Sequence, residues 1–236
     1  MSPTPQSQLT DVTRTVSPAP QGHVVSLAQT FAVHPEELWS ALTIGSHLEV
    51  WFGRARGDVV TGGRYELPDM ETAGEVLAAE EPRRLLLTWE FGRSSNELEL
   101  LVDPVEPEHP EATSDAASGA DAAAQPVAAA SELATRLTLR HTVPADAHWQ
   151  ALGPAGTGCG WDAALYALAL HLEDPSADLL PRLSRFAASP EGADFTRATA
   201  DAWFEAHVAS GAHKKPARKA SVRTAALYLG EEPELS

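Results

Sequence analysis

The sequence predicts an α+β fold in which one curved antiparallel sheet wraps around a single long helix. Three observations support this fold class. Several short segments alternate between apolar and polar residues, with the period of two that places every second side chain on one face of a strand. These segments follow one another with short turns between them, as the strands of an antiparallel sheet do. One later segment, Gly158–Glu173, carries its large apolar residues at helical spacing.

The first strand and two short helices are expected before the main run of strands. The strand covers His23–Val33, where alternate residues are apolar. Pro35 then begins a helix, because proline lacks an N–H that the first turn of a helix would leave unpaired. This helix is expected to end near Gly45, and a second short helix covers Ser46–Trp51.

Six further strands are expected after these helices, which gives a sheet of six to seven strands. Gly62-Gly63 forms the turn between the first two of them. The clearest alternation is that of the last strand, where Leu137, Leu139, His141 and Val143 share one face. In chain order the six strands cover Arg54–Val60, Arg64–Leu67, Glu71–Glu80, Arg84–Phe91, Glu97–Val102 and Arg136–Val143.

Three segments lie outside this main domain of residues 22–174. Residues 1–21 are rich in Ser, Thr, Pro and Gln, and a disordered leader is expected there. Residues 103–131 interrupt the domain; ten of the 21 residues from Glu111 to Ser131 are alanine, which indicates a disordered loop insertion. Residues 175–236 are expected to form an appended helical region, with helices over Asp178–Ala188, Pro190–Ala209 and His213–Tyr228.

Charge and composition argue against several classes of function. The 236 residues include 33 acidic and 17 basic ones, for a net charge of −16. No nucleic-acid partner is expected, because phosphates require a basic face. No stretch approaches the roughly 18 apolar residues of a membrane span, and no signal peptide is expected. The single cysteine, Cys159, excludes an intrachain disulfide and fits a reducing compartment, so a cytoplasmic protein is expected.

A series of short motifs lies along residues 22–174, and their order is more specific than any one of them. They are Phe31-x-Val33-x-Pro35-x-x-Leu38-Trp39, Trp51-Phe52-Gly53, Gly62-Gly63, Gly74, Pro82-x-Arg84-Leu85, Thr88-Trp89, Leu137-Thr138-Leu139-x-His141 and Gly160-Trp161. Together they resemble the family named for activators of the heat-shock-protein-90 ATPase, within the START-like, or SRPBCC, superfamily.

This resemblance implies a helix-grip fold, in which the curved sheet and the long helix enclose a hydrophobic ligand cavity. The helices after residue 175 resemble an extension found in some bacterial members. The residues expected to line the cavity are Trp39, Tyr65, Trp89, Leu100, His141, Trp161 and Leu165. The alternative for the aromatic ones is simple core packing, and Trp51 and Phe52 are expected to fill a corner of the fold.

His141 is the most informative single residue among these candidates. Its strand places it on the apolar face with Leu139 and Val143. There it could hold a polar group of a ligand or act as an acid or base. The alternative is a core histidine whose ring is hydrogen-bonded to a backbone carbonyl.

No motif for catalysis, a metal or a cofactor is present, and none of these is expected. The histidines show no metal-binding spacing, and there is neither a nucleophile elbow nor a phosphate-binding loop. Gly156-x-Gly158-x-Gly160 is interpreted as a flexible entry to the long helix. Cys159 lies at the start of that helix, where a thiolate is favoured, but the sequence shows no partner base.

Three hypotheses about function follow from these observations. The leading one is a domain, not obviously catalytic, that binds a small hydrophobic molecule of drug-like size, with His141 orienting it. The second is a protein-interaction module, of a co-chaperone or stress-response type, with an exposed apolar patch around Trp203-Phe204 or on the C-terminal helices. The third is a cyclase or hydrolase that uses His141 together with a second titratable group in the cavity.

Overall fold

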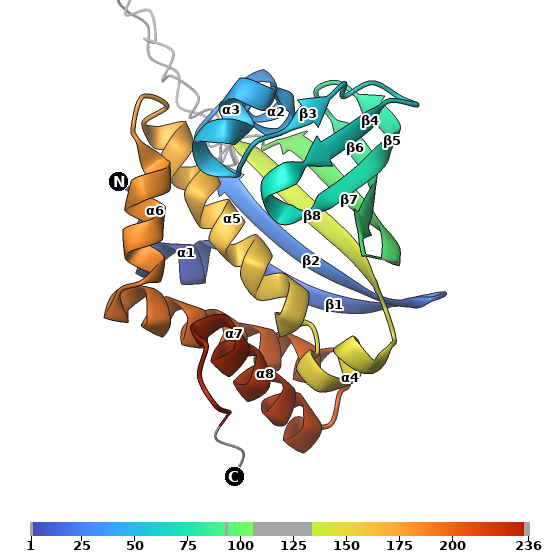
Figure 1. Ribbon diagram of the computed structural model, residues 1–236, viewed down its shortest axis with the longest axis vertical. Helices are drawn as coiled ribbons and strands as arrows, with labels where there is room; N and C mark the ends of the chain where they lie inside the picture. Colours follow the sequence, from blue (N-terminus) through green and yellow to red (C-terminus); the bar gives the residue numbers. More distant parts are fainter. Residues whose placement is uncertain (1, 93, 106–133, 234–236) are drawn as a thin grey trace, which may run out of the picture.

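One eight-stranded antiparallel sheet curves around the long helix α5 (Ala155–Glu173) in the computed structural model, which describes residues 2–92, 94–105 and 134–233 (Figure 1). The strand order is β1-β2-β8-β7-β6-β5-β4-β3. The predicted fold class is confirmed, with more strands than the six to seven expected. The strands are β1 (Thr13–Ala19), β2 (Gly22–Phe31), β3 (Arg56–Gly57), β4 (Arg64–Leu67), β5 (Thr72–Glu80), β6 (Arg84–Phe91), β7 (Ser94–Pro104) and β8 (Thr135–Pro144).

Helices cover the concave side of this sheet in two groups. The helices α2 and α3 lie at one end of α5, while α6, α7 and α8 pack against its other side (Figure 1). A short helix, α4, connects β8 to α5 and is absent from the sequence prediction. The bounds are α1 (Pro5–Asp11), α2 (Pro35–Thr43), α3 (Gly45–Trp51), the 3-10 turn η1 (Pro68–Met70), α4 (Ala147–Leu152), α6 (Leu179–Ala187), α7 (Pro190–Ala209) and α8 (Lys214–Leu229).

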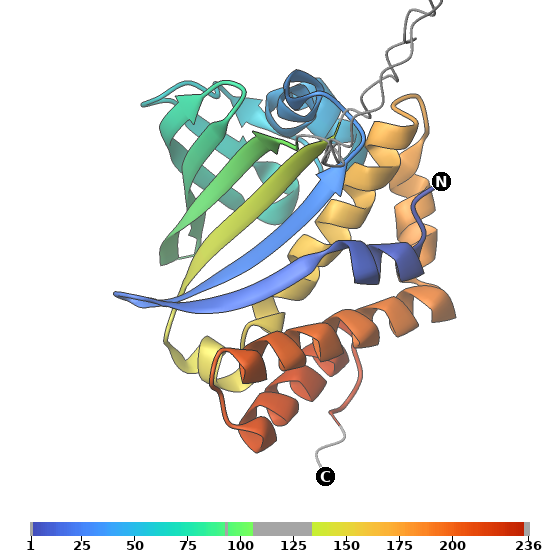
Figure 2. The same ribbon diagram turned by 180° about the vertical axis from the view of Figure 1, so that it is seen from behind.

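The two faces of the sheet differ in chemistry, as the alternating sequences predict. On β8, Leu137, Leu139, His141 and Val143 are buried against the helices. The opposite, convex face is seen in Figure 2. There Glu99 of β7 accepts hydrogen bonds from arginines on both neighbouring strands, Arg84 and Arg140, at 2.8 and 2.9 Å.

The prediction of a disordered leader is wrong, because residues 2–21 contain α1 and β1. Thr4 and Ser7 form a reciprocal capping box that starts α1. The strand β1 pairs with β2 over its whole length, from Thr13 opposite Ala28 to Ala19 opposite Gly22. The polar side chains that indicated solvation are instead paired in the interior: Gln8 and Gln29 exchange two amide hydrogen bonds of 2.9 and 3.1 Å.

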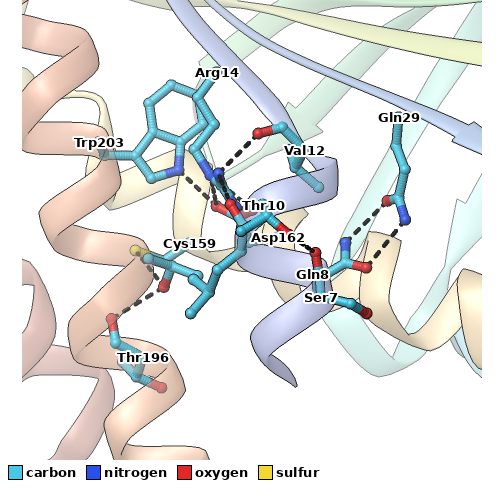
Figure 3. A network of polar contacts seen from close by, with 12 residues as sticks. Ser7, Gln8, Thr10, Val12, Arg14, Gln29, Cys159, Asp162, Thr196 and Trp203 are labelled. Carbon is cyan, nitrogen blue, oxygen red and sulfur yellow. Dashed lines mark hydrogen bonds and ion pairs between the residues drawn. The ribbon is translucent and has the colours of Figure 1, made fainter. Parts of the chain in front are cut away.

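A buried ion pair joins this N-terminal segment to the helices (Figure 3). The guanidinium of Arg14 on β1 donates to the carboxylate of Asp162 on α5, with a shortest distance of 2.6 Å. The indole N–H of Trp203 on α7 donates to the same carboxylate at 2.8 Å. Arg14 also donates to the backbone carbonyls of Leu9 and Val12. One carboxylate therefore fixes three elements that are far apart in sequence.

The glycines before Trp161 are part of α5, so their interpretation as a flexible entry is wrong. The helix begins at Ala155, three residues earlier than predicted. A Cβ atom on Gly158 would lie 2.1 Å from an indole carbon of Trp203. Glycine is needed here because α5 and α7 approach each other closely, not because the chain bends.

The three predicted helices after residue 175 are present as α6, α7 and α8. The patch expected around Trp203-Phe204 is not present, because both side chains are buried where α7 packs against α8, α5, β1 and α1. On the C-terminal helices, Leu227 and Tyr228 of α8 are exposed. The Ala-rich insertion lies almost entirely outside the described residues. Within the part of the chain that the structure describes, no helix is both long and apolar enough to cross a membrane.

Candidate functional site

An apolar cavity of about 110 Å³ lies between the concave face of the sheet and α5. Strands β4 to β8 and the middle of α5 supply its walls, and their inward side chains are buried. These strands alternate, so every second residue contributes to the wall. The buried lining residues are Trp51, Tyr65, Leu67, Val76, Leu85, Leu87, Leu98, Leu100, Leu137, Leu139, Leu165 and Leu168.

One end of the cavity lies closest to solvent, beneath α2, α3 and the segment before β4. Apart from the buried Trp51, the lining residues from these parts are partly or fully exposed, and they include Leu48 and the charged Arg56. Gly57 has φ +98°, and a Cβ there would lie 2.0 Å from the carbonyl oxygen of Arg64, so only glycine lets β3 approach β4 this closely.

Two polar side chains of the buried cavity wall, Tyr65 and Trp51, are already hydrogen-bonded within the fold. The Tyr65 hydroxyl donates to the carbonyl oxygen of Thr88 at 2.7 Å, and burial raises the pKa of Tyr65. The Trp51 indole N–H donates to the carbonyl oxygen of Ala41 at 3.1 Å. The cavity therefore offers an apolar wall to a bound molecule, with few free polar contacts.

Three aromatic side chains and His141 form a cluster at the side of the cavity near the start of α5. The rings of Phe52 and Trp161 are parallel within 6°, with centroids 6.1 Å apart. Trp89 meets Trp161 edge to face at 5.2 Å. The His141 ring lies 5.9 Å from both tryptophans.

His141 is held in one tautomer by its neighbour. Its Nδ1 accepts a hydrogen bond of 3.1 Å from the indole N–H of Trp161. Burial lowers the pKa of His141 to about 4, so the ring is neutral at pH 7. A neutral imidazole has one N–H, and because Nδ1 is an acceptor, that N–H is on Nε2. The sequence left open a core histidine whose ring is hydrogen-bonded to a backbone carbonyl. The structure instead shows a hydrogen bond to the side chain of Trp161.

The structure brings together five of the seven predicted cavity residues: Tyr65, Trp89, Leu100, Trp161 and Leu165 all line the cavity. His141 does not; it lines a neighbouring surface hollow that shares Phe52, Trp89 and Trp161 with the cavity. Trp39 is buried in the core and borders a separate surface groove. Its place in the cavity prediction is wrong, because the residues of α2 that line the cavity are Leu42 and Thr43, one turn further along the helix.

Sequence reasoning missed the contribution of α2 and α3. Leu42, Leu48, Trp51 and Phe52 line the cavity, although the last two were expected only to fill a corner. The sequence could have identified Leu42, because it lies three residues after Trp39 and therefore on the same face of the helix. A second buried histidine, His171 of α5, was also missed; its Nδ1 has no hydrogen-bond partner among the described residues.

No group of metal ligands or activated nucleophile occurs among the residues that the structure describes. No cluster of three His, Cys, Asp or Glu side chains is found there. Cys159 is buried inside α5 beside Thr199, and burial raises the pKa of its thiol to about 12. The thiol is therefore protonated at neutral pH, in contrast to a reactive cysteine.

The fold and cavity define a helix-grip domain of the START-like class. The family model of Activator of Hsp90 ATPase homolog 1-like protein matches residues 32–173. This match covers more than half of the chain, and the protein belongs to that family. No curated protein sequence matches the chain.

Solved structures share the fold at low sequence identity. CalU16 from Micromonospora echinospora, solved in solution, is 22% identical, with a TM-score of 0.59 over 85% of this chain and 97% of that one. Its crystal structure gives 21% and 0.56 over 83% and 97%. EF2215 from Enterococcus faecalis, described as a conserved protein of unknown function, is 16% identical, with a TM-score of 0.55 over 88% and 96%. In each of these matches, the matched part of this chain is longer than residues 32–173. The shared fold therefore includes some of the elements that flank the family match.

Proposed function

We propose that this protein binds a small, uncharged, apolar molecule in the cavity between the sheet and α5. The observation that carries the proposal is the lining, which is almost wholly aliphatic and aromatic and whose tyrosine hydroxyl already has a partner. An empty apolar cavity costs dispersion contacts that a bound ligand restores.

The buried and single cysteine suits a reducing compartment, and we propose that the protein is located in the cytoplasm.

The volume of the cavity limits the size of the ligand. Drug-sized ligands occupy pockets of roughly 300–1,000 Å³, whereas an apolar cavity of about 150 Å³ takes up benzene. At about 110 Å³, this cavity fits one ring or a short branched chain. A larger ligand requires displacement of α3 or of the segment before β4, whose lining residues are partly exposed.

The expected affinity follows from the apolar area that the ligand buries. A single ring that buries about 150 Å² gains roughly 4 kcal/mol at 25 cal/mol per Å². That free energy corresponds to a dissociation constant near 1 mM. A ligand that also opens the end beneath α3 buries more area and binds more tightly.

Thermal unfolding with small aromatic and aliphatic compounds at millimolar concentration tests this proposal. Ala164 lines the cavity on α5, and Ala164→Leu fills part of it; Ala163 is exposed on the same helix, and Ala163→Leu is the matched control. We expect ligands to raise the melting temperature of the wild type and of the control, but not of Ala164→Leu. Equal shifts in all three proteins would contradict binding in the cavity.

No specific observation favours the other two hypotheses. The protein-interaction hypothesis expected an exposed apolar patch around Trp203-Phe204 or on the C-terminal helices. Trp203 and Phe204 are buried. Leu227 and Tyr228 are exposed near the end of α8, but two adjacent side chains do not make the patch of several hundred Å² that marks an interface. The cyclase or hydrolase hypothesis requires a titratable partner for His141. In the described part of the chain, the ring's hydrogen-bond partner is the indole of Trp161, and burial is the cause of its lowered pKa.

A further inference from the structure

A surface hollow of about 330 Å³ lies beside the cavity and has a different chemistry. Phe52, Trp89 and Trp161 separate the two spaces, because their side chains line both. On the hollow's side, Met70, His141 and Thr157 complete the lining. The hollow therefore combines flat aromatic walls with a buried imidazole and a hydroxyl, neither of which lines the cavity.

The imidazole of His141 has hydrogen-bonding capacity that the protein does not use. The Trp161 indole occupies Nδ1, which places the single N–H of the neutral ring on Nε2. Nε2 is one of two buried side-chain nitrogens or oxygens without a partner among the described residues. Buried donors are almost always paired in folded proteins, so an unpaired donor beside a hollow indicates a place where a ligand completes the bond.

The same tautomer decides what kind of ligand group can bind. Nε2–H donates, so its partner must be an acceptor such as a carbonyl oxygen. The hollow's lining contains no cationic side chain, so a carboxylate would lose its hydration without gaining a counter-charge. The acceptor is therefore uncharged, and the faces of Phe52 and Trp161 favour a planar, aromatic molecule around it.

We propose that the hollow is a second binding site, for the carbonyl group of an uncharged aryl ketone or a similar planar carbonyl compound. The carbonyl oxygen accepts a hydrogen bond from Nε2 of His141, and the aromatic part lies against Phe52 and Trp161. Nε2 is itself buried, so the incoming carbonyl must shift partly exposed side chains of the hollow. Met70 is the most easily moved, because its chain is unbranched. The site does not require the cavity to be occupied.

A matched pair of compounds tests this proposal: 2-acetylnaphthalene, and 2-isopropenylnaphthalene, in which a methylene group replaces the carbonyl oxygen. Calorimetric titration of the wild type should show the ketone binding about tenfold more tightly, the ratio expected for one hydrogen bond. His141→Phe should remove this preference, and His141→Gln, which restores an N–H donor, should recover part of it. Equal affinities in the wild type, no binding of either compound, or a preference that survives His141→Phe would each overturn the proposal.

Two further measurements separate this site from the cavity. Ala164→Leu, which fills the cavity, should leave the ketone preference unchanged; its loss would place the ketone in the cavity and overturn the proposal, even if the proposed cavity function holds. In wild-type protein labelled with ¹⁵N-histidine, the ketone should move the Nε2–H proton of His141 to lower field, as a hydrogen bond does, and the alkene should not cause this downfield shift. This spectrum needs no variant to fold, and an unchanged Nε2–H resonance under saturating ketone would refute the hydrogen bond.

Discussion

Replacing Asp162 by alanine removes the carboxylate that joins β1, α5 and α7. The Arg14 guanidinium would be left almost fully buried without its ion partner, and the Trp203 indole N–H without its acceptor. Breaking a buried ion pair from one side costs about 3–5 kcal/mol, because the remaining charge has lost its hydration and its partner. This is a large part of the 5–15 kcal/mol that holds a typical domain folded. For a chain of this size, it lowers the melting temperature by roughly 6–20 °C.

Urea unfolding followed by circular dichroism measures this loss directly. The matched control is Asp201→Ala, which removes an exposed ion pair with Arg218 and should cost less than about 1 kcal/mol. Arg14→Met should also destabilise the protein, because Asp162 is then buried without its cation. A loss below about 1 kcal/mol for Asp162→Ala would show that this carboxylate does not hold β1, α5 and α7 together.

Three further predictions concern single residues. The pKa of His141 is about 4 in the folded protein and near 6.5 in the unfolded chain, so between these pH values the unfolded chain binds one more proton. The free energy of unfolding of the wild type should therefore fall by about 3 kcal/mol as the pH falls from 6.5 to 4. In His141→Phe, the pH dependence of urea unfolding should be weaker by that amount. Gly158→Ala places a methyl group against Trp203 and should destabilise the protein by about 1–3 kcal/mol. Gly160→Ala is the control: its Cβ would be 3.1 Å from a movable tyrosine hydroxyl, so it should cost little stability in the same unfolding measurement. Equal losses of stability in the two variants would contradict the close packing of α5 against α7. Cys159 should react with a thiol reagent only after unfolding, because it is buried and its pKa is raised to about 12, and rapid labelling of the native protein would show that α5 opens.

The sequence predicted the elements whose signals are local. The last strand was predicted within one residue at each end, because its strict alternation reflects one buried and one solvated face. Helix α7 was predicted with the correct bounds, because Ser189 caps its start and Pro190 follows in the first turn.

The N-terminal segment could not be predicted in the same way. Two of its buried side chains, Gln8 and Arg14, are of residue types that are mostly exposed to solvent. Their burial is stabilised by Gln29 and Asp162, partners 21 and 148 residues away. Such pairing is a property of the tertiary fold, and no local pattern reports it.

The candidate site was predicted in part for the same reason. Alternation correctly identified Leu100 and Trp89 as inward-facing, and both line the cavity. The placement of α2 and α3 over the sheet decides whether a buried residue lines the cavity or packs in the core. The sequence does not show this placement, so Trp39 was wrongly predicted to line the cavity. The hydrogen bond between Trp161 and His141 joins a strand to a helix, and the sequence gives no sign of it.

A crystal structure determined under xenon pressure would show whether the apolar cavity is open to a ligand, because xenon enters apolar cavities without needing a specific chemical group. We predict a xenon atom between the sheet and α5, in contact with Leu139 and Leu165. In crystals of Ala164→Leu, that xenon atom should be absent, and in Ala163→Leu it should remain. A wild-type structure in which side chains fill this space and xenon binds only elsewhere would show that the protein has no ligand cavity between the sheet and α5.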